Sequence, residues 1–167
     1  MDQSIAFKAI GVIHSGHTVP EETPIQPCYA PEAEGLVEVF PEYAEGLRDI
    51  EGYSHIYLIY QHHKAGPAKL ITRSCLQKVE RGVFSTRVPA RPNPIGLSIV
   101  KLLSREGNML RVGGIDVLDG APLLDIKPYS RRIDCVLGTK DGWQEEVDDS
   151  TAMELGRKGG LVDNAQG

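Results

Sequence analysis

The sequence predicts an all-β fold, a small β-barrel or sandwich. Six or seven short segments of strand composition are separated by turn residues, and helical periodicity of the apolar residues is nearly absent. The chain has 167 residues, 41% hydrophobic and 25% charged, which is ordinary usage for one folded domain. This composition argues against a disordered chain and against a coiled coil.

The strands are expected in chain order, and each is recognised by its apolar pattern and the turn residues that bound it. They are residues 5–14, 35–40, 55–61, 82–86, 96–103, 109–117 and 133–137. The run HIYLIYQ at 55–61 is typical of a buried strand, and Pro41 opens a short helix. The turn at 106–108 predicts a hairpin between its two flanking strands.

Residues 15–35 form a long Pro-rich passage. Its four prolines exclude a helix or a central strand. A loop of this length in a small domain is uncommon unless it binds something or is disordered. We expect a barrel domain at 1–140 and a short, partly disordered C-terminal extension at 141–167, whose last residues (ELGRKGGLVDNAQG) indicate a frayed tail.

The location of the protein is constrained by what the sequence lacks. No apolar run reaches the length of a membrane span, and the first residues lack the pattern of a signal peptide. The three cysteines are far apart and form no CxxC pair, which argues against a disulfide framework. We therefore expect a soluble, cytoplasmic protein with no membrane partner.

The net charge of −5 hides an uneven distribution. Residues 1–63 carry two basic and ten acidic residues, residues 64–111 carry ten basic and two acidic, and residues 112–167 carry six basic and eleven acidic. The middle segment, with its excess of eight positive charges, can attract phosphate even in an acidic protein. The alternative is that these side chains are solvated and pair with the acidic first segment.

The segment 84–98 (FSTRVPARPNPIGLS) is the first chemical motif. Its prolines stiffen the backbone, so Arg87 and Arg91 lose little entropy when they grip an anion. A guanidinium binds phosphate or carboxylate through two parallel hydrogen bonds. Asn93, between two prolines, presents an amide with donor and acceptor groups. The alternative is a rigid surface corner without a ligand.

The segment 113–129 (GGIDVLDGAPLLDIKPY) is the second motif, with three carboxylates in an apolar stretch. Buried carboxylates must be paired, hydrogen-bonded or protonated. Asp119 precedes a glycine and is typical of a turn. Asp116 lies in an expected buried strand, where Lys127 is a candidate ion partner.

A metal site is not expected. The paired histidines His14/His17 and His62/His63 lack further ligands at zinc spacing, and neighbouring strand residues face opposite sides of a sheet. The sequence also lacks GxGxxG, GxxxxGK[ST] and GxSxG, so dinucleotide-binding, nucleotide-phosphate and α/β-hydrolase functions lack their residues.

The two motifs, together with Ile10–His14 (IGVIH), Gln26-Pro27 and Tyr53–His55 (YSH), resemble the TrmO family, also called TsaA-like or VirR-like. The similarity covers about residues 5–130. The resemblance implies a non-Rossmann β-barrel methyltransferase that binds S-adenosylmethionine without a metal and pairs as a homodimer. It implies methylation of the N6 amine of threonylcarbamoyladenosine at position 37 of tRNA. Ala121 departs from the family, in which many members carry Thr.

By matched position, the resemblance implies a donor pocket made by the Pro-rich loop, the strand ending at 61, and both motifs. These residues are Gln26, Pro27, Cys28, His63, Lys64, Arg87, Leu97, Gly113, Gly114, Ile115, Asp116 and Asp119.

Catalysis requires an acceptor for the proton of the adenine amine. The candidates are Asn93, which is the first choice because its flanking prolines fix it, Asp116 and Asp125. The basic residues expected to contact RNA are Lys69, Arg73, Lys78, Arg81 and Arg91. Two alternatives remain: a methyltransferase with a non-tRNA acceptor, and a non-catalytic module that binds S-adenosylmethionine or RNA.

Overall fold

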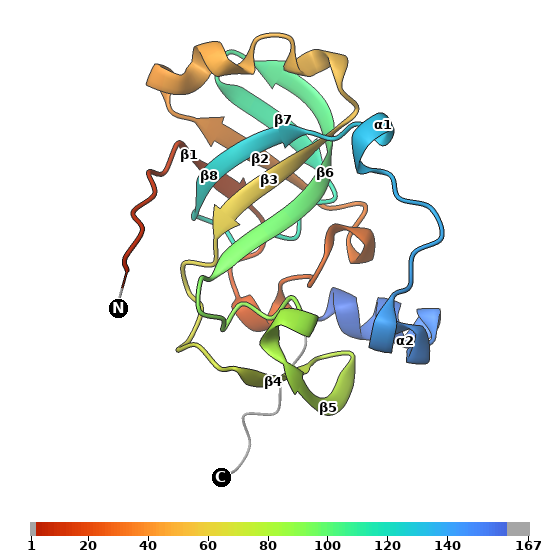
Figure 1. The fold of residues 1–167 in the computed structure, drawn as a ribbon. Helices are drawn as coiled ribbons and strands as arrows, with labels where there is room; N and C mark the ends of the chain where they lie inside the picture. The colour runs from red at the N-terminus through yellow and green to blue at the C-terminus, as the bar shows by residue number, and fades with distance from the viewer. Residues whose placement is uncertain (1–2, 160–167) are drawn as a thin grey trace.

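A computed structural model describes residues 3–159 and shows a closed six-stranded antiparallel barrel (Figure 1). Around the barrel the strands follow the order β1-β2-β7-β6-β3-β8, and pairing of β1 with β8 closes it. Their bounds are β1 Gly11–Ser15, β2 Glu34–Val39, β3 His55–Gln61, β6 Ile95–Glu106, β7 Met109–Gly113 and β8 Ala121–Pro128. Closure removes the free edges that make open sheets prone to aggregation.

Alternation along the strands fills the barrel. In β3 the buried residues are Ile56, Leu58 and Tyr60, while the residues between them are partly exposed. Other strands contribute Ile13, Val37, Val100, Leu110, Val112 and Leu123, all at most 1% exposed. The core therefore follows from period-two patterning.

The remaining elements lie at the two ends of the barrel (Figure 1). The 3-10 helices η3 (Pro41–Leu47) and η4 (Ile50–Gly52) lie at one end. At the other end lie η2 (Pro27–Tyr29), the hairpin of β4 (Ile71–Ser74) and β5 (Gln77–Gly82), and helix α2 (Asp149–Arg157). The short elements are η1 Pro20–Glu22, η5 Val83–Ser85, α1 Arg131–Asp134 and η6 Gly142–Glu146.

The expected all-β barrel is confirmed, and the strand at 55–61 has the expected bounds. Four expectations are wrong. The strand expected at 109–117 ends at Gly113 as β7, so Asp116 follows the strand instead of lying in it. The strand at 133–137 is replaced by the short helix α1 and the segment after it, and most of 82–86 belongs to η5. The first strand starts only at Gly11. β8 was missed because Pro122, Asp125 and Pro128 interrupt its apolar pattern.

The C-terminal segment folds against the Pro-rich loop. Asp148 caps α2 by accepting a hydrogen bond from the Thr151 amide at 2.9 Å. The Ile25 amide donates to the Gly156 carbonyl at 3.0 Å, and Arg157 Nε donates to the Tyr29 carbonyl at 3.2 Å.

The expected frayed end is therefore wrong for residues 154–157, which belong to α2, while residues 160–167 lie outside the described part. The division at residue 140 stays a prediction. Within residues 3–159, no helix is long and apolar enough to cross a membrane.

Candidate functional site

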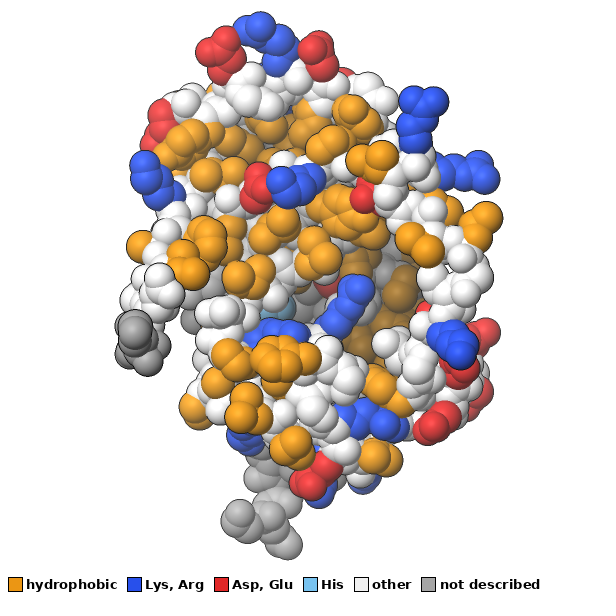
Figure 2. All heavy atoms as spheres, in the orientation of Figure 1, with side chains coloured by type: hydrophobic (Ala, Val, Ile, Leu, Met, Phe, Trp, Pro, Cys, Tyr) orange, Lys and Arg blue, Asp and Glu red, His pale blue; other side chains and the backbone are white. Residues whose placement is uncertain are grey.

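The candidate site lies at the end of the barrel that faces η2, where both sequence motifs meet the Pro-rich loop. Figure 2 shows a hollow in the surface here, between the barrel and the elements below it, with Lys or Arg side chains at its edge. The residues come from the segment after β7, the inner face of β6, the end of β3, and η2.

Asp116 is the buried polar centre of this site. Its side chain is 6% exposed, and Ser98 Oγ donates a hydrogen bond to Asp116 Oδ1 at 2.5 Å. Ser98 Oγ lies 3.1 Å from the hydroxyl of Tyr60, so the three side chains form one chain of contacts. Burial raises the pKa of Asp116 to about 7 and also raises the pKa of Tyr60. The carboxyl can therefore exchange a proton near neutral pH.

Backbone geometry around Gly114 delivers Asp116 to this position. Gly114 has a φ of 75°, a conformation that favours glycine, and it lies against Pro27 of η2. The amides of Gly114 and Ile115 both donate to the Ala33 carbonyl, at 2.7 and 3.1 Å. The glycine pair in the motif therefore turns the chain from β7 into the site.

Asp119 holds the neighbouring loop together. Its Oδ1 accepts a hydrogen bond from the Ser15 amide at 3.0 Å, and Ser15 Oγ donates to the Val117 carbonyl at 2.6 Å. His17 Nε2 lies 2.9 Å from the Ile115 carbonyl. Asp119 thus stabilises the loop that follows β7 by binding the Ser15 amide. Its contact with a ligand stays a prediction.

The Pro-rich loop places residues near Asp116 and Arg87. Arg87 Nη1 donates to Gln26 Oε1 at 2.6 Å, which ties the first motif to the loop. Burial raises the pKa of the Cys28 thiol, and the nearby charges of Asp116 and Arg87 oppose each other there. Gln26, Cys28, Arg87 and Asp116 therefore come together from three distant parts of the sequence, and the donor pocket that the resemblance implies here stays a prediction.

The end of β3 adds two histidines. The ring of His62 packs edge-on against Tyr60, with 5.2 Å between centroids. Burial, with the positive charge of Arg91, lowers the pKa of His62 to about 4, so its ring is neutral at physiological pH. Nδ1 of His63 is buried and lacks a hydrogen-bond partner among the described residues. Lys64 follows them and is exposed.

Three predicted site residues are not brought to Asp116. Leu97 is 45% exposed and lies on the outer face of β6, opposite Ser98. Asp125 is ion-paired with Lys127 at 3.0 Å and lines a depression beside Tyr43, under η3. Lys127 is therefore the partner of Asp125, and its expected pairing with Asp116 is wrong. Asn93 is exposed in the loop before β6.

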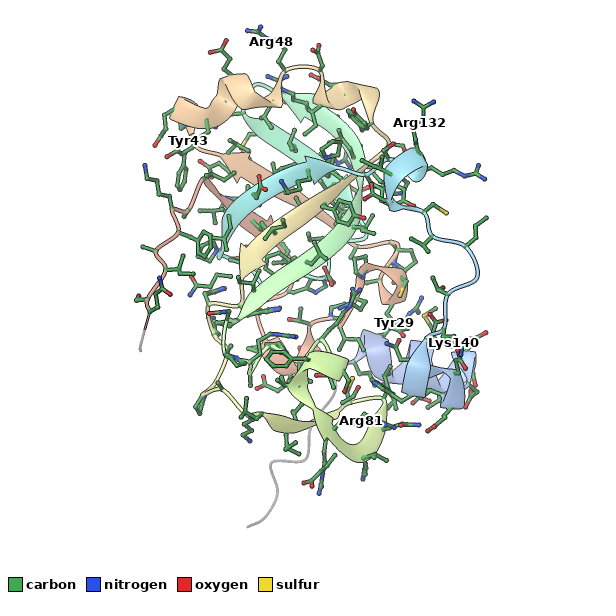
Figure 3. All side chains as sticks on the ribbon, viewed as in Figure 1. Tyr29, Tyr43, Arg48, Arg81, Arg132 and Lys140 are labelled. Atoms are coloured by element: carbon green, nitrogen blue, oxygen red, sulfur yellow. The ribbon has the colours of Figure 1, made fainter. Side chains whose placement is uncertain are left out.

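The predicted RNA-contacting residues fall into two groups. Arg73 pairs with Glu80 at 3.2 Å, and Arg91 Nη1 donates to the Thr86 carbonyl at 3.1 Å. Arg81, on the side of β5 toward α2, stacks on the ring of Trp143 at 4.8 Å (Figure 3). Lys69 and Lys78 are exposed. The lysines thus offer free charge more readily than the arginines.

Sequence reasoning missed Ser98, Tyr60 and His62. Ser98 carried a signal, because a serine at an inward position of an alternating apolar strand needs a polar partner. The partner of Tyr60 was not predictable, since it depends on the register in which Leu58 pairs with Ser98. In residues 3–159 no three His, Cys, Asp or Glu side chains cluster as metal ligands.

Comparison with known proteins places this geometry in a family. The profile of the tRNA-methyltransferase O N-terminal domain matches residues 12–135. The chain belongs to this family. A probable S-adenosyl-L-methionine-binding protein of Pyrococcus abyssi is 50% identical over 85% of this chain and 77% of its own length.

Two further relatives extend the match. The human tRNA (adenine(37)-N6)-methyltransferase is 34% identical over 78% of this chain, which spans 31% of that protein. The crystal structure of TrmO from Pseudomonas aeruginosa superposes with a TM-score of 0.70 at 37% identity, covering 84% of this chain and 62% of that one. These matches confirm the resemblance stated from the sequence, and with it the expected methyltransferase class.

The site residues fit S-adenosylmethionine, the ligand that appears in the names of several relatives. A sulfonium donor is cationic, and Asp116 provides a carboxylate in a buried position. The Gly114 turn leaves backbone close to the mouth of the site, where a side chain would have to meet Pro27. Gln26 and Arg87 supply hydrogen-bonding groups at the rim.

Proposed function

We propose that this protein transfers a methyl group from S-adenosylmethionine to N6 of adenosine 37 in tRNA, and that this adenosine already carries the threonylcarbamoyl group. One observation carries the proposal: the buried Asp116, hydrogen-bonded to Ser98, lies within reach of the charge of Arg87, which is itself hydrogen-bonded to Gln26 of the Pro-rich loop. The reaction named for the human relative and the basic segment 64–111 support tRNA as acceptor.

The donor site in this proposal uses the loop and the Gly114 turn. When bound, S-adenosylmethionine supplies an electrophilic methyl group on a positively charged sulfur. Gln26, Cys28 and Arg87 line one side, and residues 113–116 line the other. Arg87, held by Gln26, is placed to orient a carboxylate or a phosphate.

Asp116 is the proton acceptor that the geometry favours. The adenosine nitrogen is a weak nucleophile until its proton is removed, because its lone pair is delocalised. The nitrogen would bond to the methyl carbon as the bond from that carbon to the donor sulfur breaks, which leaves the sulfur as a neutral thioether. The proton of the nitrogen passes to the Asp116 carboxylate, which Ser98 holds through Oδ1. A carboxyl with a pKa of about 7 suits this role, whereas the Asn93 amide does not take up a proton at neutral pH.

A homodimer is part of the proposal. The outer face of β6 presents a row of apolar side chains, Ile95, Leu97, Ile99 and Leu103, each 38–45% exposed. We infer that a second copy covers this row and brings Leu97 close to a donor site. Ile99→Lys is expected to shift the protein to monomer in analytical ultracentrifugation, and an unchanged sedimentation coefficient would exclude this face.

A second candidate function is binding of S-adenosylmethionine without transfer. It is favoured by the name of the Pyrococcus relative, which specifies binding alone. It predicts a donor complex but no methylated product. A methyltransferase with a non-tRNA acceptor would instead leave tRNA unlabelled while labelling another fraction.

The test is transfer of labelled methyl to tRNA purified from cells with and without the threonylcarbamoyl modification. Label confined to the modified tRNA supports the full proposal. Equal label on both keeps tRNA methylation but removes the dependence on the modification. Donor binding without label in either sample leaves the second candidate.

A further inference from the structure

The hairpin of β4 and β5 and helix η5 together present an exposed apolar surface beside the site. Phe84, Leu70 and Ile71 are 77%, 67% and 60% exposed. They are neighbours, because the Val83 amide donates to the Leu70 carbonyl at 2.9 Å and Ile71 pairs with Gly82. We call these three residues the Phe84 ledge.

Buried neighbours and hydrogen bonds fix the backbone around Phe84. The fold itself therefore keeps the Phe84 side chain exposed. Val83 and Thr86, on either side, are 1% and 7% exposed, and Thr86 Oγ1 donates to the Val83 carbonyl at 2.8 Å. Between them, the Ser85 carbonyl accepts a hydrogen bond from Trp143 Nε1 at 2.8 Å. The buried neighbours hold the Phe84 ring outward in water, where an aromatic side chain gains nothing in stability.

Basic residues flank the ledge along the chain, and the acidic Glu146 of η6 lies on the hairpin 3.8 Å from Arg81. Lys69 precedes Leu70, and its amide donates to the Ala90 carbonyl at 3.2 Å, which ties it to the first motif. Arg87 follows in the same segment and reaches Gln26 at the donor loop. Figure 2 shows orange side chains over η5 at the edge of the hollow, with blue side chains between them and the opening.

Acidic side chains are scarce in this segment. Residues 64–91 contain a single one, Glu80, and it is paired with Arg73. An apolar face inside a cationic rim has the chemistry that binds an unstacked nucleobase with its phosphates. An apolar segment of a protein partner would satisfy the ring but leave the lysine and arginine charges unmatched.

We propose that the Phe84 ledge is a stacking platform for an unpaired base next to the target nucleotide, and that Lys69 contacts the phosphate of that base. This inference rests on the proposed RNA substrate. It adds a binding surface outside the donor site that selects single-stranded loops over duplex RNA.

The test is equilibrium binding of an anticodon stem-loop RNA, with the threonylcarbamoyl group on adenosine 37, by the 167-residue chain, measured separately from methyl transfer. Phe84→Ala is expected to weaken RNA binding about tenfold, as loss of one stacked base does elsewhere. Phe84→Trp is expected to retain binding, because the indole also stacks. Val79→Ala, on the same hairpin and 49% exposed, is the control and is expected to bind as wild type. S-adenosylmethionine affinity should be the same in all four proteins.

The outcomes separate this inference from the proposed function. Wild type that binds the stem-loop but transfers no methyl, with weaker binding by Phe84→Ala, supports the ledge and rejects the activity. Methyl transfer by wild type with equal RNA binding by Phe84→Ala overturns the ledge alone. Failure of wild type to bind the stem-loop overturns the ledge. A change in oligomeric state with Phe84→Ala also overturns it, because a second copy would then occupy the surface.

Discussion

Ser98 Oγ donates a 2.5 Å hydrogen bond to Oδ1 of Asp116 inside the mouth of the barrel. The bond joins the two sequence motifs, which approach each other only because β6 and β7 pair and the chain then turns at Gly114. The chemistry of the site therefore depends on a contact between Ser98 of the first motif and Asp116 of the second.

Asp116 is expected to impose a pH dependence on stability. Its pKa is about 7 in the folded protein and 3.8 as the ordinary value, so between these the folded state holds a proton that the unfolded state has lost. Wild type should lose stability as pH rises through this window, by about 1.4 kcal/mol per pH unit, and level off above it. Asp116→Asn should lack this slope in urea unfolding followed from about pH 4 to about 8. The same slope in the variant would show that another group is responsible.

Tyr60 should be sensitive to any bulk added at Gly96. A Cβ at Gly96 would overlap the Tyr60 ring, which is 4% exposed and has little room to move. Gly96→Ala is expected to lower stability by about 1–3 kcal/mol and to break the Tyr60–Ser98 contact. Gly66→Ala, where nothing lies within 4 Å, is the matched control. The same melting temperature for both variants would mean that the barrel shifts to make room for a side chain at residue 96.

Helix α2 should support donor binding without contacting the donor. Gly156 of α2 lies against the ring of Tyr29, which Figure 3 labels beside α2, and a Cβ at Gly156 would fall 2.5 Å from that ring. Gly156→Ala is expected to displace α2 and weaken S-adenosylmethionine binding several-fold, with little change in the melting of the barrel. Met153→Ala, on the exposed face of α2, should bind as wild type in calorimetry. Equal S-adenosylmethionine affinity of both variants would show that α2 does not support donor binding.

The basic residues should differ in their contribution to RNA binding. Lys69→Ala and Lys78→Ala are each expected to reduce the salt dependence of binding by about one counterion, because their charges are free to meet phosphate. Arg73→Ala should change it less, since Glu80 already neutralises that arginine. The measurement is the slope of binding affinity against salt concentration. Equal slopes for wild type and both lysine variants would remove these two residues from the interface.

Features that depend on residues close together in the sequence could be predicted, whereas features that depend on strand pairing could not. An apolar run predicted the strand at 55–61. The family motifs predicted that Gln26, Arg87 and Asp116 lie near one another. The Ser98 and Tyr60 partners were not, because they depend on the pairing register of β3 with β6. The docking of α2 was missed because Gly156 gives no apolar signal, although its lack of a side chain admits the Tyr29 ring.

Asn93 illustrates the limit of motif reasoning. Its flanking prolines suggested a fixed catalytic amide, yet the structure leaves it exposed in the loop before β6. Rigidity of the backbone gives no information about which way a segment faces. Asp116 had the weaker local signal, and burial identifies it as the stronger candidate.

The most direct test of the account is single-turnover methyl transfer at saturating S-adenosylmethionine to an anticodon stem-loop whose adenosine 37 carries the threonylcarbamoyl group, comparing wild type, Asp116→Asn and Asp125→Asn. We expect wild type and Asp125→Asn to methylate N6 of adenosine 37 at similar rates, identified by mass spectrometry of the digested RNA. Asp116→Asn should be slower by about a hundredfold or more, the usual contribution of a general base. Transfer by Asp116→Asn at the wild-type rate would contradict the assignment of Asp116 as proton acceptor.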